Sequence, residues 1–252
     1  MRRNLITLIM AAGQGKRMKN PDKSKVMYSL HGKPMIQYVT ELALKLNSKM
    51  VIPIVGHQKQ SVIDFLENNF PENTDKIKFA HQDVQLGTGH AVIQTKEYLE
   101  NFEGDVLILS GDVPLLKLET VTSFLNFHYE NNFDASLISA VLENPGGYGR
   151  ILRDGKNNFY EIREEKDCNY EEKKCNEINS GIYIIDNKIL FEALNSLKTD
   201  NSQGEYYLTD VFKYFKNTGK KIGAFPVKNV VEITGVNSVE QLEELEKEVL
   251  EL

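Results

Sequence analysis

Short runs of Ile, Val and Leu alternate along the chain with longer segments whose apolar residues recur at helical spacing. This alternation is typical of a parallel β-sheet covered by helices. For the first half of the chain we expect strands at residues 5–10, 50–55, 77–80 and 106–109, and helices at residues 34–46, 61–69, 90–99 and 120–129. The first half is therefore predicted to form three or four β-α units.

The pattern changes after residue 134, where short strand-like segments are joined by turns of glycine, asparagine and charged residues. Strands are expected at residues 136–141, 149–152, 159–163, 178–185 and 222–227, and helices at residues 190–197 and 206–215. We expect a mixed sheet laid over the ends of the first strands, where a second substrate would bind.

The last segment, residues 238–252, has the pattern of an amphipathic helix. Leu242, Leu245, Val249 and Leu252 share one face, and glutamates occupy the others. We expect this face to pack on the same domain. A seam between two copies in a weak homo-oligomer is the alternative.

Length and composition are those of an ordinary globular protein. The chain has 252 residues, of which 41% are hydrophobic and 26% charged, enough for a full core in one domain. The first ten residues contain an apolar run, but Asn4 and Thr7 interrupt it, and we expect a buried strand rather than a signal peptide. No apolar stretch approaches the roughly 20 residues that cross a bilayer. A cytoplasmic location with no membrane partner is expected.

Charge is distributed unevenly along the chain. The net charge of −6 argues against nucleic acid as a partner, yet residues 1–33 contain a single acid, Asp22. The cations of this island are Arg2, Arg3, Lys16, Arg17, Lys19, Lys23, Lys25 and Lys33. A small polyanion is the expected ligand. Cys168 and Cys175 have neither zinc nor disulfide spacing and are expected to be incidental, which fits a reducing compartment.

A glycine turn at residues 11–18 follows the first strand directly. Its small residues allow backbone N–H groups to approach a ligand closely, at the strand end where open α/β sheets bind ligands. The turn is no Walker A loop, because the nearby Gly32-Lys33 pair continues into Pro34 rather than Ser or Thr, and no dinucleotide fingerprint, because Met18 stands where the third glycine would be. The turn followed by Arg17 and Lys25 suits a triphosphate whose pyrophosphate leaves.

The strand at residues 106–109 ends in Ser110-Gly111-Asp112. A carboxylate at this point faces the same crevice as the glycine turn, and Mg2+ commonly takes one or two carboxylates with phosphate and water. Asp112 is therefore a candidate Mg2+ ligand, although a strand-terminal aspartate can also act as a turn or helix cap.

Many short segments together resemble the uridylyltransferase domain of bacterial N-acetylglucosamine-1-phosphate uridyltransferases. They occur in the family's order at residues 11–18, 25, 32–35, 82–90, 111–115, 146–151, 177–183, 205–210 and 235–242. Gln85-Leu86-Gly87-Thr88-Gly89-His90-Ala91 and Glu205-Tyr206-Tyr207-Leu208-Thr209-Asp210 are the most specific. The resemblance implies an α/β, Rossmann-like, GT-A-like fold of three layers. The central sheet would be mostly parallel, with a mixed-sheet region for the sugar. Residues 1–252 would form one domain, with about 1–133 for the nucleotide, about 134–237 for the sugar, and 238–252 as the C-terminal helix.

The resemblance also implies a role for individual residues. Backbone groups of Ala11, Ala12 and Gly13 would contact the nucleotide, with Gln82, Gly87 and Thr88 against the uracil and Arg17 and Lys25 on phosphate. Asp112 and Asn237 would bind Mg2+, although Asn237 can also be interpreted as a helix cap. The sugar would contact Ser110, Gly111, Gly147, Glu164, Asn179, Tyr206 and Asn237. His90 is expected to cap or pack at a helix start rather than to react.

The implied reaction consumes UTP and N-acetylglucosamine 1-phosphate and yields UDP-N-acetylglucosamine and pyrophosphate, for the synthesis of cell-envelope precursors such as peptidoglycan and lipopolysaccharide. The sugar phosphate attacks the α-phosphorus in line, with Arg17, Lys25 and Asp112 as the catalytic residues and no protein base. Bifunctional family members continue into a left-handed β-helix that transfers acetyl groups. This chain stops at Leu252, so no acetyl transfer is expected from it.

Three residues depart from the family pattern. Lys16 stands where threonine is common, Ser110 where tyrosine often stands, and Ser180 where threonine precedes glycine. Ser110 lacks the aromatic ring that tyrosine would place near the sugar, so the exact hexosamine is left open. A pyrophosphorylase for another sugar phosphate or nucleotide, and a non-catalytic sensor of nucleotide sugars, are the alternatives.

Overall fold

A computed structural model describes residues 3–250, and side chains as far as residue 248. Arg2 and Leu252 therefore lie outside the described residues, as does the side chain of Val249. The strands are β1 (Leu5–Ala11), β2 (Ser29–Leu30), β3 (Lys33–Pro34), β4 (Met50–Val55), β5 (Ala80–His81), β6 (Asp105–Ser110), β7 (Ala135–Val141), β8 (Arg150–Arg153), β9 (Phe159–Arg163), β10 (Glu177–Asp186) and β11 (Ile222–Pro226). The α-helices are α1 (Met35–Lys45), α2 (Lys59–Asn69), α3 (Thr88–Ile93), α4 (Lys96–Leu99), α5 (Leu118–Glu130), α6 (Asn187–Asn195), α7 (Asp210–Asn217) and α8 (Val239–Leu250).

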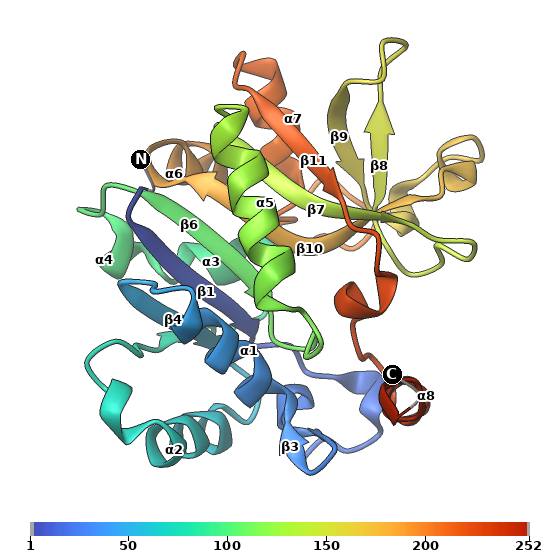
Figure 1. Ribbon diagram of the computed structural model, residues 1–252. Helices are drawn as coiled ribbons and strands as arrows, with labels where there is room; N and C mark the ends of the chain where they lie inside the picture. Colours follow the sequence, from blue (N-terminus) through green and yellow to red (C-terminus); the bar gives the residue numbers. More distant parts are fainter. Residues whose placement is uncertain (1–2, 251–252) are drawn as a thin grey trace.

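One central sheet runs through the molecule in the order β11-β7-β10-β6-β1-β4-β5 (Figure 1). β1 pairs in parallel with β4 and β6, and β4 with β5. β10 is antiparallel to both β6 and β7, and β11 is parallel to β7. The mostly parallel sheet expected from the sequence is confirmed.

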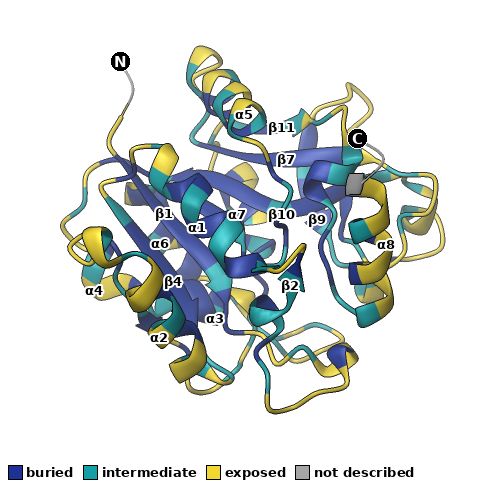
Figure 2. Ribbon diagram, turned by 60° about the horizontal axis from the view of Figure 1, so that its bottom comes forward, coloured by how far each residue is buried: buried dark blue, intermediate teal, exposed yellow. Residues whose placement is uncertain are grey.

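Helices cover both faces of this sheet, which gives three layers. In β1, Leu5 and Ile9 pack with α1, α2 and α5 on one face, whereas Ile6 and Leu8 pack with α3, α6 and α7 on the other. Side chains of a strand alternate between faces, so a strand covered on both sides is apolar throughout. Figure 1 shows α5 in front of the sheet with α3 and α6 behind it, and Figure 2 shows the strands buried between helices with exposed outer faces.

The second half of the chain extends the sheet sideways. We expected its strands to lie over the ends of the first strands, but β10 pairs along β6 and carries β7 and β11 with it. The physical reason is that β6 would otherwise expose a row of unpaired backbone groups, which β10 satisfies. Among the described strands of this half, β8 and β9 alone lie off this path.

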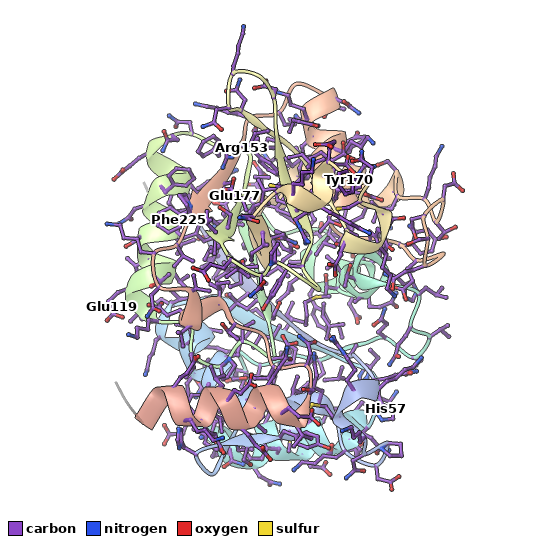
Figure 3. The ribbon with its side chains drawn as sticks, turned by 90° about the vertical axis from the view of Figure 1, so that its right-hand side faces the viewer. His57, Glu119, Arg153, Tyr170, Glu177 and Phe225 are labelled. Carbon is purple, nitrogen blue, oxygen red and sulfur yellow. The ribbon has the colours of Figure 1, made fainter. Side chains whose placement is uncertain are left out.

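The hairpin is fastened to the start of β10. β8 pairs with β9 and, at Arg150, with Ile178 of β10. Arg153 makes a two-pronged ion pair with Glu177, with both nitrogen–oxygen distances at 2.7 Å (Figure 3). Glu177 also accepts a 2.7 Å hydrogen bond from Ser139 of β7. The hairpin therefore stands above the carboxyl edge of the sheet at a defined place.

Most predicted elements are present, and three were predicted wrongly in extent. The helix expected at residues 90–99 is broken, because the Thr95 hydroxyl donates to Val92 O (2.7 Å) where the chain leaves α3. The helix expected at residues 206–215 starts only at Asp210, because the Tyr206 backbone pairs instead with the loop before α3. β5 is also shorter than residues 77–80 suggested.

The C-terminal helix packs on its own domain, as expected. Leu242 and Leu245 of α8 join Leu30, Met35 and Val236 in a separate cluster under the β2–β3 hairpin, which the sequence did not predict. Lys19 and Glu240 form an ion pair (2.8 Å) between the lysine-rich loop and α8. The helix thus braces the loop that carries the glycine turn.

Two other expectations concern single features. Cys168 and Cys175 are both free, as expected. Among residues 3–250, no helix is long and apolar enough to span a bilayer.

Candidate active site

The carboxyl ends of the central strands meet at one edge of the sheet. The register aligns Met10 with Ser110 and Ala11 with Val55, so the loops that follow β1, β4 and β6 lie side by side. They line a cavity of about 500 Å³. Its walls include the predicted site residues Ala11, Ala12, Gly13, Lys25, Gln82, Gly87, Thr88, Ser110, Asp112, Gly147, Glu164, Asn179 and Asn237. The structure thus brings most of the sequence-predicted residues together.

The glycine turn forms the floor of one end of this cavity. Ala11 and Ala12 are buried, whereas Gly13 is exposed and has no neighbour within 4 Å of the place a Cβ would occupy. The open space lies directly against the backbone, as expected for a turn that binds through N–H groups. The Gln85 side chain donates to Ala12 O (2.7 Å) and holds the turn against the next loop.

Arg17 lies beside the main cavity rather than within it. Its exposed side chain lines an adjoining cavity of about 360 Å³ together with Lys16, and both cavities share Lys25, Gln85, Glu205 and Asn237. A phosphate chain that leaves the main cavity past Lys25 would therefore meet two further cations.

Lys25, Asp112 and Asn237 converge at the junction of the two cavities. The Lys25 ammonium contacts a carboxylate oxygen of Asp112 and lies 3.1 Å from Asn237 Oδ1. The Asn237 amide nitrogen donates to Gly235 O (3.3 Å), which turns its oxygen toward the cavity. Ser238 caps α8 by accepting from the Gln241 N–H (3.2 Å), so Asn237 is free of the cap role that its position suggested.

These oxygens fit a hard cation that is completed by other ligands. Within the described part of the chain, no cluster of three or more His, Cys, Asp or Glu side chains could hold a metal by itself. One carboxylate oxygen and one amide oxygen already share a positive neighbour, the Lys25 ammonium. This donor set suits Mg2+ with phosphate and water as further ligands.

Gln82, Gly87 and Thr88 form the opposite wall. Gln82 is only 4% exposed, and its amide nitrogen donates to Gly87 O (2.9 Å). Gly87 adopts φ 109° and ψ 175°, a conformation open essentially to glycine, and a Cβ there would meet Tyr206 O at 2.6 Å. The Thr88 hydroxyl accepts from the Leu208 N–H (2.9 Å). The wall is therefore built by packing residues 205–208 onto the loop before α3.

Tyr206 and Gly111 do not line the main cavity. The Tyr206 backbone accepts from the Gly89 N–H and donates to Leu86 O, both at 2.8 Å, so this residue supports the wall. At Gly111 a Cβ would come within 2.8 Å of Met10 O, which makes glycine necessary where β6 passes β1. Their contact with a sugar stays a prediction.

Glu164 lines the wall contributed by the second half of the chain. Glu164 Oε1 accepts from the Thr209 hydroxyl (2.9 Å). Burial raises the pKa of this carboxyl, and the nearby carboxylates of Asp210, Asp167 and Glu205 raise it further, against the lowering effect of Thr209. The Gly147 N–H, on the same wall, is bonded to the Glu165 carboxylate.

A bulge in β10 presents Asn179 to the same space. Between Asn179 and Tyr183 the pairing with β7 shifts, and Gly181 takes φ 78°. The Asn179 amide donates to the Tyr183 hydroxyl (2.7 Å) and accepts from the Gly181 N–H (3.1 Å). The Ser110 hydroxyl donates to Gly181 O (3.3 Å), so the end of β6 and the bulge are linked.

Several cavity residues were not assigned from the sequence. Gln85, Glu205 and Thr209 lie within the two most specific motifs, but a motif does not show which of its side chains face inward. Tyr148 also lines the cavity and is hydrogen-bonded to the backbone of Gly235. No local pattern marks that contact, because its partners are far apart in the sequence.

Comparison with known proteins places these features in context. Residues 6–230 match the family described as nucleotidyl transferase. The chain is 46% identical over 243 residues to the bifunctional protein GlmU of Thermoanaerobacter pseudethanolicus, covering 96% of this chain and 51% of that protein. Identity to the bifunctional protein GlmU of Acetivibrio thermocellus is 43% over 240 residues, covering 95% and 50%. The chain thus spans about half the length of these relatives.

A solved structure has a similar fold at low sequence identity. The crystal structure of UDP-glucose pyrophosphorylase complexed with UDP-glucose superimposes with a TM-score of 0.80, covering 98% of this chain and 99% of that one at 21% identity. This likeness supports the α/β nucleotidyltransferase fold expected from the sequence.

Proposed function

The chain belongs to the nucleotidyl transferase family, and from that premise we propose that it transfers the UMP group of UTP to N-acetylglucosamine 1-phosphate, giving UDP-N-acetylglucosamine and pyrophosphate. The observation that carries the proposal is the convergence of Lys25, Asp112 and Asn237 between the glycine turn and the Glu164 wall. Charge neutralisation is needed at that junction, because a nucleoside triphosphate and a sugar phosphate would meet there.

The nucleotide would occupy the part of the cavity built by residues 1–133. The base would lie against Gln82, Gly87 and Thr88, and the phosphates along the backbone of residues 11–13. Lys25 and Arg17 line the path toward the adjoining cavity, which suits departure of pyrophosphate in that direction. Fixed cations that meet charge as it develops on leaving oxygens lower the barrier of phosphoryl transfer.

The sugar phosphate would occupy the part built by residues 134–237. Glu164 and Asn179 both line the cavity, and so does Gly147, which is exposed. A carboxylate and an amide can each make paired hydrogen bonds with sugar hydroxyls and the N-acetyl group. N-acetylglucosamine 1-phosphate is proposed because the sequence motifs resemble those of N-acetylglucosamine-1-phosphate uridyltransferases, and the 46% and 43% identity to two GlmU proteins supports this choice.

Asp112 and Asn237 would hold Mg2+. A bound Mg2+ would neutralise phosphate charge and favour in-line geometry at the α-phosphorus. The attacking phosphate oxygen is already an anion, so a bond forms from it to the α-phosphorus as the bond to pyrophosphate breaks, and no side chain has to remove a proton. Lys25 would hold the two ligand side chains together and contact phosphate.

The product would serve the synthesis of cell-envelope precursors in the cytoplasm. Pyrophosphate release by purified protein tests the proposal, using UTP, CTP and dTTP with the 1-phosphates of glucose, glucosamine and N-acetylglucosamine. We expect the highest kcat/KM for UTP with N-acetylglucosamine 1-phosphate, and strict dependence on a divalent cation. A preference for glucose 1-phosphate would refute the sugar assignment, and binding of UDP-sugar without turnover would indicate a sensor.

A further inference from the structure

His90 lies directly behind Gln82, outside the cavity lining. It is part of the first turn of α3, and its Nδ1 is 3.2 Å from the Gln82 amide nitrogen. The same nitrogen is 2.9 Å from Gly87 O. The mechanism proposed above assigns no role to this histidine.

The orientation of the Gln82 amide follows from its carbonyl neighbour. Gly87 O can only accept, and it already accepts the Ala91 N–H (3.2 Å) as the first bond of α3. If the Gln82 amide were reversed, two carbonyl oxygens would face each other in a site where Gln82 is only 4% exposed. The amide nitrogen must therefore face Gly87 O.

This orientation decides the tautomer of His90. A neutral imidazole has one N–H and can accept at one nitrogen only. His90 Nδ1 faces the Gln82 amide nitrogen and His90 Nε2 faces the Gln94 amide nitrogen, each at 3.2 Å, so only one of the two amides can donate to the neutral ring and the other must turn away. Gln94 is partly exposed and water can replace its bond to His90 O, whereas buried Gln82 has no such substitute. The proton therefore resides on Nε2.

We propose that His90 is a positioning residue for base selection, because its unprotonated Nδ1 takes the second hydrogen of the Gln82 amide. Both hydrogens of that amide are then engaged within the protein. Across residues 3–250, no hydrogen bond uses Gln82 Oε1, which is left to face the cavity as a lone acceptor. This inference rests on the proposed function, in which Gln82 reads the base.

With Gln82 Oε1 as a lone acceptor, the base is selected by whether its N3 atom carries a hydrogen. Uracil presents an N3–H donor, whereas cytosine presents an unprotonated N3 that repels the acceptor. Thymine presents the same N3–H as uracil. His90 therefore affects the choice between UTP and CTP but not the choice between UTP and dTTP, a distinction that a general packing role would not produce.

Two variants of His90 test the role of the acceptor. His90→Leu removes it, and we expect the UTP-to-CTP ratio of kcat/KM to fall by about tenfold or more, mainly through the KM for UTP, while the UTP-to-dTTP ratio stays unchanged. His90→Asn places an amide oxygen near the position of Nδ1 and should keep the wild-type ratio. His81→Leu, an exposed histidine in the neighbouring strand, is the control. An unchanged UTP-to-CTP ratio in His90→Leu, or an equal loss in His90→Asn, would overturn the inference.

The tautomer can be measured without turnover. Long-range ¹H–¹⁵N correlation spectra of the wild-type protein resolve imidazole tautomers, and the chain has only five histidines, with His90→Asn identifying the signal. We expect His90 in the Nε2–H form; an Nδ1–H form would disprove the inference even if His90→Leu failed to fold. Wild-type protein without preference for UTP would refute the proposed function, and base reading by Gln82 with it. A wild-type preference that His90→Leu retains would refute the role of His90 alone.

Discussion

At the scale of single residues, the site depends on which polar atom of each side chain is free. Ser238 makes the helix cap, and this leaves the Asn237 oxygen to share the Lys25 ammonium with Asp112. The sequence predicted Asp112 and Asn237 as Mg2+ ligands with hard oxygens, and the structure brings these two side chains together, whereas the metal role stays a prediction. The sequence left open whether Asn237 caps α8 or faces the cavity, because both roles use the same amide.

Substitution of Asp112 tests the junction most directly. Asp112→Asn keeps the shape of the side chain but removes the charge that would balance Mg2+, so we expect kcat to fall by about a hundredfold or more with a higher Mg2+ requirement. The thermal midpoint should stay close to that of the wild type, since an amide oxygen still accepts from Lys25. Steady-state rates across a Mg2+ titration provide the measurement. Asp83→Asn, an exposed carboxylate outside the cavity, is the control, and a wild-type titration in Asp112→Asn would exclude the metal role.

At the scale of elements, the cavity wall of Gln82, Gly87 and Thr88 forms because two segments far apart in the sequence pack backbone to backbone. Residues 205–208 lie against the loop before α3, and Gly87 permits the approach through its φ of 109°. The sequence marked both segments as motifs but predicted helix at 206–209. The helical period is a local property of residues 206–215. It cannot show that the Tyr206 N–H and C=O form hydrogen bonds with Leu86 and Gly89 instead.

Replacement of Gly87 tests this packing. Gly87→Ala would place a Cβ 2.6 Å from Tyr206 O in a backbone region that alanine avoids, so we expect a loss of about 2 kcal/mol or more in the free energy of unfolding and a raised KM for UTP. Urea unfolding and steady-state kinetics measure the two effects. Gly204→Ala separates strain from contact, because its φ of 64° is also left-handed but no atom lies within 4 Å. Equal effects of the two variants would argue against the packing account.

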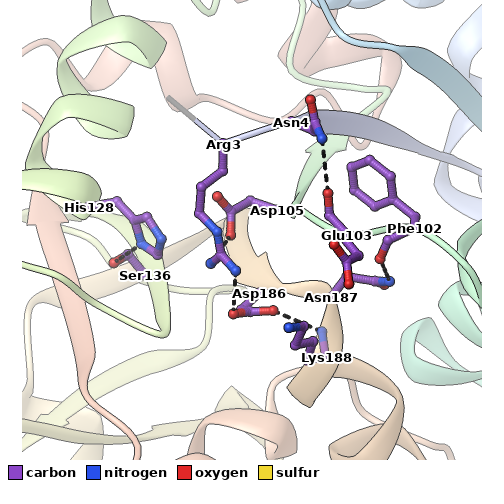
Figure 4. Close-up of polar contacts among 10 residues, drawn as sticks. All are labelled: Arg3, Asn4, Phe102, Glu103, Asp105, His128, Ser136, Asp186, Asn187 and Lys188. Atoms are coloured by element: carbon purple, nitrogen blue, oxygen red, sulfur yellow. Dashed lines mark hydrogen bonds and ion pairs between the residues drawn. The ribbon is translucent and has the colours of Figure 1, made fainter. Parts of the chain in front are cut away.

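At the scale of the whole molecule, the candidate active site lies at one edge of the sheet, and a second polar cluster lies at the opposite edge. Arg3 pairs with Asp105 and Asp186 at 2.9 Å each, and the His128 ring contacts the Ser136 hydroxyl at 2.9 Å (Figure 4). These residues join the segment before β1 to β6, β7, β10 and α5. Burial raises the pKa of Asp105 to about 6, against the lowering effect of Arg3, and lowers that of His128 to about 4.

The two shifts act in opposite directions on stability. His128 contributes stability above its unfolded pKa of 6.5, and this is lost as pH falls toward 4, because only the unfolded chain takes up the proton readily. Asp105 contributes stability below its unfolded pKa of 3.8, which is lost as pH rises through about 6. Between these values the two slopes partly cancel in the wild type.

Replacement of His128 should reveal the pH dependence that Asp105 gives to the free energy of unfolding. We expect His128→Gln to gain stability relative to the wild type as pH falls from 6.5 to 4, by about 1 kcal/mol per pH unit. Urea unfolding at pH values from 7 to 4.5 measures the difference. His81→Gln, at an exposed position, should show no such trend, and parallel curves for His128→Gln and the wild type would contradict the assignment.

The sequence by itself determined the type and order of most elements, because an apolar period is a local property that a strand or helix expresses wherever it lies. It also indicated a phosphate site, since the glycine turn, Lys25 and Asp112 stand out by residue type and spacing; their catalytic roles stay predictions. Only the tertiary structure decided that β10 enters antiparallel beside β6, that Tyr206 supports Gly87, and that His90 stands behind Gln82. Each of these depends on partners from separate elements or loops, and no local pattern records such pairings.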